Sequence, residues 1–173
     1  MKTTLNGTYL NSIEATSKSY IDQSHVWNLG GYDSSFTSNG TRANFYNKER
    51  GTTVYSGRPT TWTGAIALMY PSDWGYASSS TSSVCDTTAL YNWNNQSTCY
   101  TTSWLYNSSY HQWTLTPRSD YSHYVFYAYT SGLVSNGSAT SAGIGVRPVL
   151  YLKSSIKITS GSGTSSSPYI LSA

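Results

Sequence analysis

Hydrophobic residues recur at helical spacing near the start of the chain, in LNSIEATSKSYID, from Leu10 to Asp22. Asn11 or Ser12 is positioned to cap a helix there. The face that this helix would bury consists of Leu10, Ile13, Tyr20 and Ile21. Two shorter helical segments are predicted further on. One is PSDWGYAS, where Pro71 stands just ahead of a Ser72 cap, and the other lies near TTALYNW, at residues 87–93.

Strand-like segments occupy much of the remaining chain and dominate its last third. The earlier ones are HVWNLGGY, FYNKERGTTVYSG and the continuous apolar run GAIALMY. The later ones are QWTLTP, YVFYAY, GLVS, GVRPVLYLK, SIKIT and SPYIL. We expect GVRPVLYLK to be a central strand with Val146 and Leu150 buried. This order of elements predicts one α+β domain over residues 1–173, in place of a doubly wound fold.

The segment SDYSHYVFYAY, Ser119 to Tyr129, is unusually aromatic. Strand alternation would place Tyr121, His123, Val125, Tyr127 and Tyr129 on one face, and Tyr124, Phe126 and Ala128 on the other. We expect Phe126 and Val125 to belong to the framework and most of the other rings to face solvent. The six tryptophans are expected in the core: Trp27, Trp62, Trp74, Trp93, Trp104 and Trp113.

The composition favours an exported protein. Only 10% of the residues are charged, aromatic residues reach 15%, and the formal charge of +3 is scattered along the chain. We therefore expect no nucleic-acid partner. No apolar run is long enough to span a membrane, and MKTTLNGTYL lacks the apolar core of a signal peptide, so we expect any signal and anchor to lie outside this chain.

The two cysteines, Cys85 and Cys99, lie fourteen positions apart. In an exported chain they are expected to form a disulfide across a short loop, and two free buried thiols are the alternative. Two cysteines and three dispersed histidines do not make a zinc site, and the seven carboxylates are too scattered for a calcium cage. We expect no metal and no cofactor.

Enzyme chemistry finds little support in the sequence. No carboxylates are paired as glycoside cleavage requires, and no GxSxG nucleophile elbow is present. His111 and His123 flank Asp120, but serine, histidine and aspartate are too common here to indicate a catalytic triad. We expect a protein that is not an enzyme.

Several segments together resemble one known group of proteins. They are VWNLGGY, ERGTTVYSGRPTTWTGAIALMYPSDWGYA, LYNW, WLY, QWTLTP and GVRPVLYLKSSIKITSG. In this order they resemble the C-type-lectin-fold variable proteins of bacterial diversity-generating retroelements, and more distantly the sulfatase-modifying-factor-like domains. The resemblance implies a C-type lectin-like fold with two helices and mixed antiparallel strands, carried on a pilin-like or otherwise anchored stalk. The cysteines that the sulfatase-modifying relatives need near the C-terminal core are missing after Cys99, and the Glu-Pro-Asn and Gln-Pro-Asp triplets of calcium lectins are also missing.

The resemblance also implies a variable region, at about residues 108–146, between framework segments 1–107 and 147–173. In these systems mutation of template adenines cannot convert AAC codons into codons for Trp, Met, Gln, Lys or Glu, and none of these residues occurs from Arg118 to Val146. The side chains expected on one exposed binding face are Tyr110, His111, Arg118, Asp120, Tyr121, His123, Tyr124, Tyr127, Tyr129, Asn136, Ser138, Thr140, Ser141 and Ile144. Tyrosine suits such a face because it offers a large, rigid contact area at low entropic cost.

The function expected is therefore binding of a macromolecular ligand at the bacterial cell surface. The ligand would be a protein or glycan on another cell, a phage or a host surface. The domain would be monomeric and would not insert into a membrane. The alternative is a non-variable structural or adhesin domain of a pilus or cell-wall protein, which could bind carbohydrate through its exposed rings.

Overall fold

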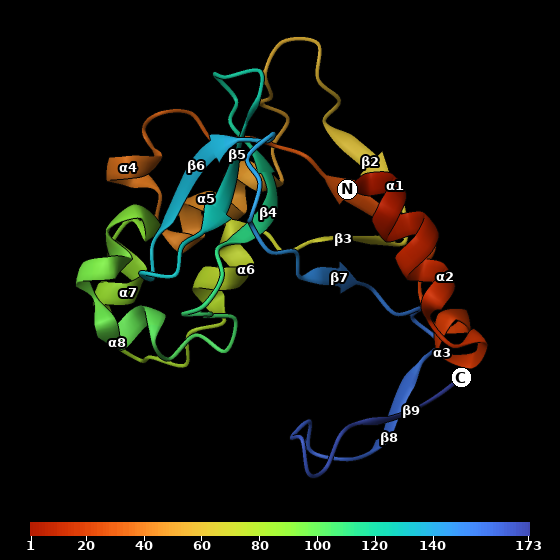
Figure 1. Ribbon diagram of the computed structural model, residues 1–173. Helices are drawn as coiled ribbons and strands as arrows, with labels where there is room; N and C mark the ends of the chain where they lie inside the picture. Colours follow the sequence, from red (N-terminus) through yellow and green to blue (C-terminus); the bar gives the residue numbers. More distant parts are fainter. The chain divides into compact units, whose positions relative to one another are not determined.

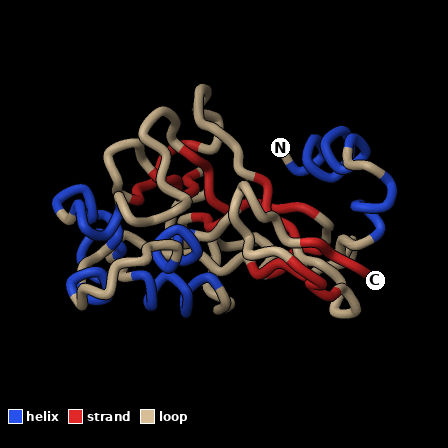
Figure 2. The backbone as a smooth tube through the Cα atoms, turned by 90° about the horizontal axis from the view of Figure 1, so that it is seen from below, coloured by secondary structure: helices blue, strands red, loops and turns tan.

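The computed structural model describes all 173 residues and shows a mixed α+β fold with short helices and small antiparallel sheets (Figure 1). Long loops join the helices and strands, as the tan segments of Figure 2 show. The backbone divides into two compact units. Unit 1 comprises Met1–His25, Thr63–Ala67 and Val149–Ala173, and unit 2 comprises Val26–Trp62 and Leu68–Pro148.

Helical conformation is spread over many short segments instead of the two helices expected. Those of unit 1 are α1 (Lys2–Thr4), the π-helical η1 (Leu5–Tyr9), α2 (Leu10–Ser12) and α3 (Ala15–Ser19). Those of unit 2 are α4 (Phe36–Asn39), α5 (Arg42–Glu49), α6 (Pro71–Tyr76), α7 (Val84–Thr87), the 3₁₀ helix η2 (Leu90–Asn95) and α8 (Ser97–Tyr100). The longest of them, α5, has 8 residues.

The strands form four small sheets. They are β1 (Val26–Asn28), β2 (Thr61–Thr63), β3 (Ile66–Leu68), β4 (Gln112–Pro117), β5 (Tyr124–Ala128), β6 (Val134–Ser138), β7 (Pro148–Leu150), β8 (Lys157–Ser160) and β9 (Ile170–Ser172). The pairings are β1 with β2, β3 with β7, and β8 with β9, and the strand order of the fourth sheet is β4-β5-β6. The β4-β5-β6 sheet is antiparallel throughout.

Unit 1 corrects the expected Leu10–Asp22 helix. The helical run begins at Lys2, ends at Ser12, and is interrupted by an extended Ile13. A new helix, α3, then starts behind Glu14, whose carboxylate accepts the backbone N–H groups of Thr16 and Ser17 at 2.9 and 3.0 Å. A carboxylate at this position satisfies N–H groups that have no partner within the helix, so Glu14 is the cap in place of Asn11 or Ser12.

Asn6 joins two distant parts of unit 1. Its side-chain oxygen accepts the backbone N–H groups of Ala65 and Ile66 at 2.9 and 3.0 Å. Its amide nitrogen donates to the Ile66 carbonyl at 2.8 Å. One asparagine side chain thus supplies both the donor and the acceptor that a neighbouring strand would offer.

Unit 2 is built around Phe126 of β5, which has no exposed surface. The rings of Phe36 from α4 and Phe45 from α5 meet it edge to face, at centroid distances of 4.9 and 5.1 Å. Ala128 and Val134 are buried on the same side of the sheet. The inward face of the β4-β5-β6 sheet therefore packs on the helices of this unit.

Helix α5 replaces the strand expected at FYNKERGTTVYSG. Thr41 caps the helix by accepting the N–H of Asn44 at 3.2 Å. Phe45 and Glu49, one helical turn apart, are both fully buried. The pair at i and i+4 is the helical signal in this segment, and it competes with the β-rich residues that follow.

The region around the disulfide follows the prediction more closely. Cys85 of α7 and Cys99 of α8 are bonded to each other, which confirms the disulfide, and η2 lies between them. Trp93 and Leu90 of η2 have no exposed surface, and Trp93 packs on Trp74 of α6 at 5.3 Å. Pro71 is the first residue of α6, so the N-cap is Tyr70 and not Ser72.

Two expectations about burial are wrong. Trp62 is only half-buried, and Trp104 is 75% exposed, although its neighbour Leu105 is buried. Val146 and Leu150 are 44% and 36% exposed. The strand near them, β7, spans only Pro148–Leu150 and pairs only with β3, so it is an edge strand and not a central one. Proline, which has no N–H to donate, is tolerated at such an edge and at the first residue of a strand.

Candidate functional site

The expected site residues lie mainly on and around the β4–β5 hairpin of unit 2, and the register of the sheet assigns them to two faces. Phe126 pairs with Asn136, and Tyr124 pairs with Ser138, so these residues face inward. Trp113 pairs with Tyr127, which faces outward together with Val125. The strand alternation predicted for SDYSHYVFYAY is therefore present in β5.

A first group of rings, here called the hairpin cluster, consists of Tyr121, His123 and Tyr124 at the connection between β4 and β5. Tyr121 stacks on Tyr124 at a centroid distance of 5.1 Å, and His123 meets Tyr124 edge to face at 4.8 Å. Tyr121 remains 50% exposed, and His123 is exposed as well. These rings hold one another in place without being buried, which leaves their edges available to a ligand.

Arg118 packs against this cluster. It was expected on the exposed binding face, but only 6% of it is exposed, so that expectation is wrong. Its guanidinium donates to both oxygens of Asp120 at 2.7 Å and to the side-chain oxygen of Asn136 at 3.2 Å. It also lies 5.4 Å from the ring centroids of Phe36 and Tyr121. A buried guanidinium with these bonds positions its neighbours, and it has little surface left for a ligand.

Asp120 is fixed by the same interaction. The hydrogen bonds from Arg118 hold the pKa of the Asp120 carboxyl below its usual value. The backbone N–H of Ser34 also donates to this carboxylate, at 3.0 Å. The negative charge of Asp120 is thus compensated within the protein.

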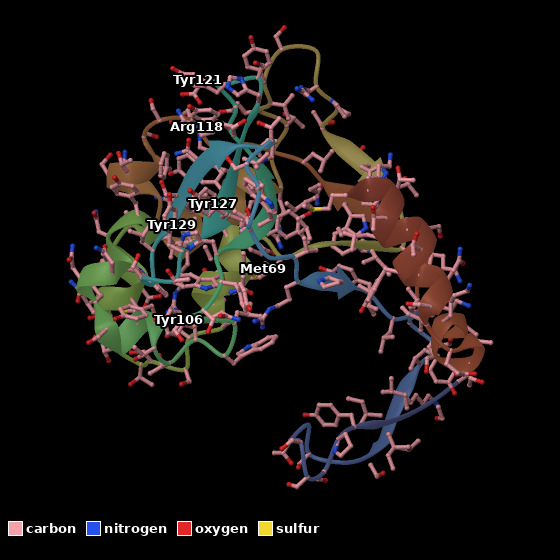
Figure 3. All side chains as sticks on the ribbon, in the orientation of Figure 1. Met69, Tyr106, Arg118, Tyr121, Tyr127 and Tyr129 are labelled. Atoms are coloured by element: carbon pink, nitrogen blue, oxygen red, sulfur yellow. A yellow bond between two sulfur atoms is a disulfide. The ribbon has the colours of Figure 1, made fainter.

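A second group of rings, here called the sheet-face cluster, consists of the half-buried His111, Tyr127 and Tyr129 on the outward face, and these rings pack around Trp113, which is itself buried as expected. Tyr127 stacks on Tyr129 at 4.5 Å and meets Trp113 at 5.3 Å, and His111 lies 4.5 Å from Tyr129. The hydroxyls of Tyr127 and Tyr129 are hydrogen-bonded to each other. Partial burial raises the pKa of the Tyr127 hydroxyl, and the bond to Tyr129 adds to the shift. Figure 3 labels this pair on the sheet, with Arg118 and Tyr121 toward the hairpin connection.

The rest of the expected set is spread around these two clusters. Tyr110 is 64% exposed just before β4. Thr140 and Ser141 are exposed in the loop after β6, and Ser138 bonds to Thr140 at 2.7 Å. Ile144 is half-buried next to Gly145, which pairs with Gln112 of β4. The structure thus places these residues on the β4-β5-β6 sheet and in the loops next to it, and it separates the inward Tyr124, Asn136 and Ser138 from the outward Tyr127.

A cavity of about 330 Å³, here called the hairpin pocket, opens beside the hairpin cluster. One wall is formed by Leu115, Val125 and His123 of the hairpin. A second part of the lining comes from the loop between α5 and β2, which contributes Tyr55, Arg58 and Pro59. These three residues are not among the site residues expected from the sequence. No local signal could have indicated them, because Arg58 bonds to the Ser122 carbonyl, 64 positions away, at 2.5 Å.

Arg58 differs from the other arginines of the site by its lack of a carboxylate partner. Arg118 is paired with Asp120, and further away Arg42 is paired with Asp86 and Arg50 with Glu49. No ion pair forms at Arg58, whose side chain is exposed. The hairpin pocket therefore combines apolar walls with one uncompensated positive charge.

No three histidine, cysteine, aspartate or glutamate side chains lie close enough together to hold a metal ion. No helix has the length and apolar character required to cross a bilayer. The disulfide is compatible with an oxidising compartment such as the cell exterior.

No family model matches the chain, and neither a curated protein nor a solved structure is significantly similar to it.

Proposed function

We propose that this protein is a ligand-binding domain displayed on a bacterial surface, with residues 108–146 as a variable region on a C-type lectin-like scaffold. The domain resembles the variable proteins of diversity-generating retroelements in the sequence segments quoted above. Its ligand is a macromolecule, and the face that binds it includes the sheet-face cluster and the hairpin cluster.

The observation that carries this proposal is the separation of core and face within one hairpin. Phe126 and Ala128 of β5 are fully buried, whereas Tyr127 and Tyr129 reach the surface from the same segment. Inward side chains cannot change without leaving cavities, but outward ones can change at little cost to the core. A strand of this kind can support many different surfaces on one fold.

The outward face of the sheet continues from the sheet-face cluster to the hairpin pocket, whereas Tyr124 of the hairpin cluster faces inward. Trp113 pairs with Tyr127, and Pro117 pairs with Val125, which lies two residues earlier in β5 and on the same face. Leu115, Pro117 and Val125 line the hairpin pocket. The outward face therefore runs from the stacked tyrosines to the pocket, and a protein-sized ligand can contact both.

A display library tests the proposal and gives a first prediction. Full randomisation of Tyr121, His123, Tyr129 and Thr140 is expected to leave most clones folded and to yield binders against a panel of surface proteins. A control library of equal size, randomised at Phe126, Ala128 and Val134, is expected to lose folded display, because deletion of a buried large side chain costs about 3–5 kcal/mol. Equal losses in the two libraries would show that the outer rings are packing groups and would contradict the proposal.

The coding DNA tests the retroelement origin separately. Codons derived from AAC should be concentrated between Arg118 and Ile144, with a near-copy of this segment beside a reverse transcriptase gene. Ordinary codon usage in this segment, with no near-copy, would favour a non-variable domain of a pilus or cell-wall protein.

A carbohydrate-binding adhesin is the second candidate, and the exposure of Trp104 favours it. An indole that is 75% exposed offers a flat apolar surface on which a sugar ring can stack. Binding to a glycan array that is lost in Trp104→Ala and retained in Tyr121→Ser would support this candidate over the first.

A further inference from the structure

The hairpin pocket contains groups that are fixed by the framework. Three of its lining residues, Tyr55, Arg58 and Pro59, lie outside residues 108–146. Substitutions in the variable region would change the hairpin side of the pocket and leave Tyr55, Arg58 and Pro59 unchanged. Whatever binds in the pocket therefore meets the same cation each time.

The bonds at Arg58 leave most of its guanidinium free. One nitrogen donates to the Ser122 carbonyl, which turns the side chain toward the hairpin. Arginine carries five N–H donors in a rigid fork, so several remain available. Asp120, the acidic residue of the hairpin, is already bonded to Arg118, and it does not compete for Arg58.

We propose that the hairpin pocket binds a peptide segment of the ligand in which an acidic side chain stands next to an aromatic or large aliphatic one. This inference rests on the proposed function, since it names the chemistry of the ligand for that same face. The apolar side chain lies between Leu115, Val125 and Pro59, and the carboxylate forms an ion pair with Arg58. Tyr121 closes the pocket through its exposed ring edge.

The carboxylate belongs to an acidic side chain within the peptide and not to a chain terminus. Free terminal carboxylates are usually captured by several backbone N–H groups that point to one spot. At the pocket, the backbone N–H of Arg58 is already bonded to the Tyr55 carbonyl at 3.0 Å. The free donors are those of the side chain, whose planar fork matches a single carboxylate.

Three short peptides test this assignment by NMR titration of the intact chain. N-acetyl-Asp-Phe-amide carries the proposed pair of side chains, and N-acetyl-Asn-Phe-amide is its uncharged isostere. N-acetyl-phenylalanine carries a terminal carboxylate instead. We expect the Asp peptide to bind about three- to fivefold more tightly than the Asn peptide, with amide shifts centred on His123, Val125 and Ala139. High salt should reduce the difference, because the ion pair is partly exposed.

Matched variants separate the charge from the shape of the pocket. Arg58→Gln is expected to make the Asp and Asn peptides bind equally. Lys157→Gln removes one positive charge from an exposed position of β8 that does not line the pocket, and it should leave the preference unchanged. Ala139→Phe fills the pocket from its exposed rim and should weaken both peptides.

The proposal is overturned if none of the peptides binds, if the Asp and Asn peptides bind equally to the unmodified chain, or if the preference survives Arg58→Gln. Tighter binding of N-acetyl-phenylalanine would assign the site to a terminal carboxylate and would also overturn it. The display library answers a different question. If the library yields binders but the Asp peptide does not bind, only this inference about the pocket is wrong. If the Asp peptide binds but the library yields no binders, the pocket binds peptides while the proposed variable binding face is wrong.

Discussion

Glu49 shows how far one buried residue can couple this fold to pH. It lies at the end of α5 without exposed surface, and its carboxylate accepts the backbone N–H of Ser72 at 3.0 Å as well as the Ser72 hydroxyl. The Arg50 guanidinium contacts it at 3.1 Å. Burial raises the pKa of the Glu49 carboxyl to about 7, although the bonds from Ser72 oppose the shift.

The free energy of unfolding is therefore expected to fall as the pH rises from about 5 to about 8. Between the unfolded pKa of 4.5 and the folded pKa of about 7, the folded state binds more protons than the unfolded one, so protonation favours folding. The full effect is about 3 kcal/mol. Urea unfolding at several pH values measures it.

Glu49→Gln should flatten this dependence. Glu14→Gln should not, because the backbone hydrogen bonds of Glu14 lower its pKa and its titration lies below this pH window. A slope that survives Glu49→Gln would assign the pH dependence to another group.

Thr114 and Thr116 of β4 are both buried, but their hydroxyls differ in hydrogen bonding. The Thr114 hydroxyl bonds to the Phe126 carbonyl at 2.8 Å, whereas the Thr116 hydroxyl has no hydrogen-bond partner in the protein. We expect Thr116→Val to raise the free energy of unfolding by about 1 kcal/mol, since it removes an unsatisfied buried hydroxyl. Thr114→Val should lower it by about 1–2 kcal/mol. Chemical denaturation compares the two, and a destabilised Thr116→Val would mean that a buried water satisfies the hydroxyl.

The residue-scale predictions from sequence succeeded where a strand pattern fixed the side-chain direction. Phe126 and Val125 are both expected in the framework; Phe126 is buried, whereas Val125, on the opposite face of β5, is half-buried and faces outward. The burial of Arg118 was missed because it depends on distant partners. Arg118 is buried by Asn136 and Phe36, and nothing in the neighbouring sequence indicates those contacts.

At the scale of elements, the disulfide holds α7 and α8 around η2. Replacing Cys85 and Cys99 by alanine is expected to lower the free energy of unfolding by about 3 kcal/mol, because the open loop gains entropy in the unfolded state. Thermal or chemical unfolding measures the loss. Intact-mass analysis with and without reductant checks the bond itself, and two alkylatable thiols in the native protein would contradict it.

Element predictions failed where two local signals conflicted. The segment from Phe45 contains β-favouring residues further on, but Thr41 and the pair Phe45 and Glu49 make its first part a helix. Near the end of the chain, Pro148 limits β7 to a short strand. In both places one residue that changes backbone hydrogen bonding outweighed the hydrophobic pattern.

At the scale of the whole molecule, the mixed α+β class could be predicted because it depends on the order of local patterns. Which segments of the chain come together in unit 1 could not be predicted. This unit combines the first 25 residues with the last 25 and with Thr63–Ala67 between them. Pairings such as Ile21 with Leu152 join segments that are far apart in the sequence, and contacts of this kind slow folding because a long loop must close first.

Asn6, which joins two of those segments, also makes unit 1 sensitive to chemical ageing. It is followed by Gly7, whose missing side chain leaves its backbone nitrogen free to attack the side-chain amide carbonyl of Asn6. Ammonia leaves, and water then opens the succinimide to aspartate or isoaspartate. Deamidation would replace the donor to the Ile66 carbonyl by a negative charge. Since a Cβ at Gly7 would meet no other atom, Gly7→Ala should slow this ageing and also favour the helix by about 0.5–1 kcal/mol. Peptide mapping of the unmodified protein and of Gly7→Ala after alkaline storage measures the deamidation of Asn6 in each. Equal deamidation would show that backbone geometry, and not Gly7, sets the rate.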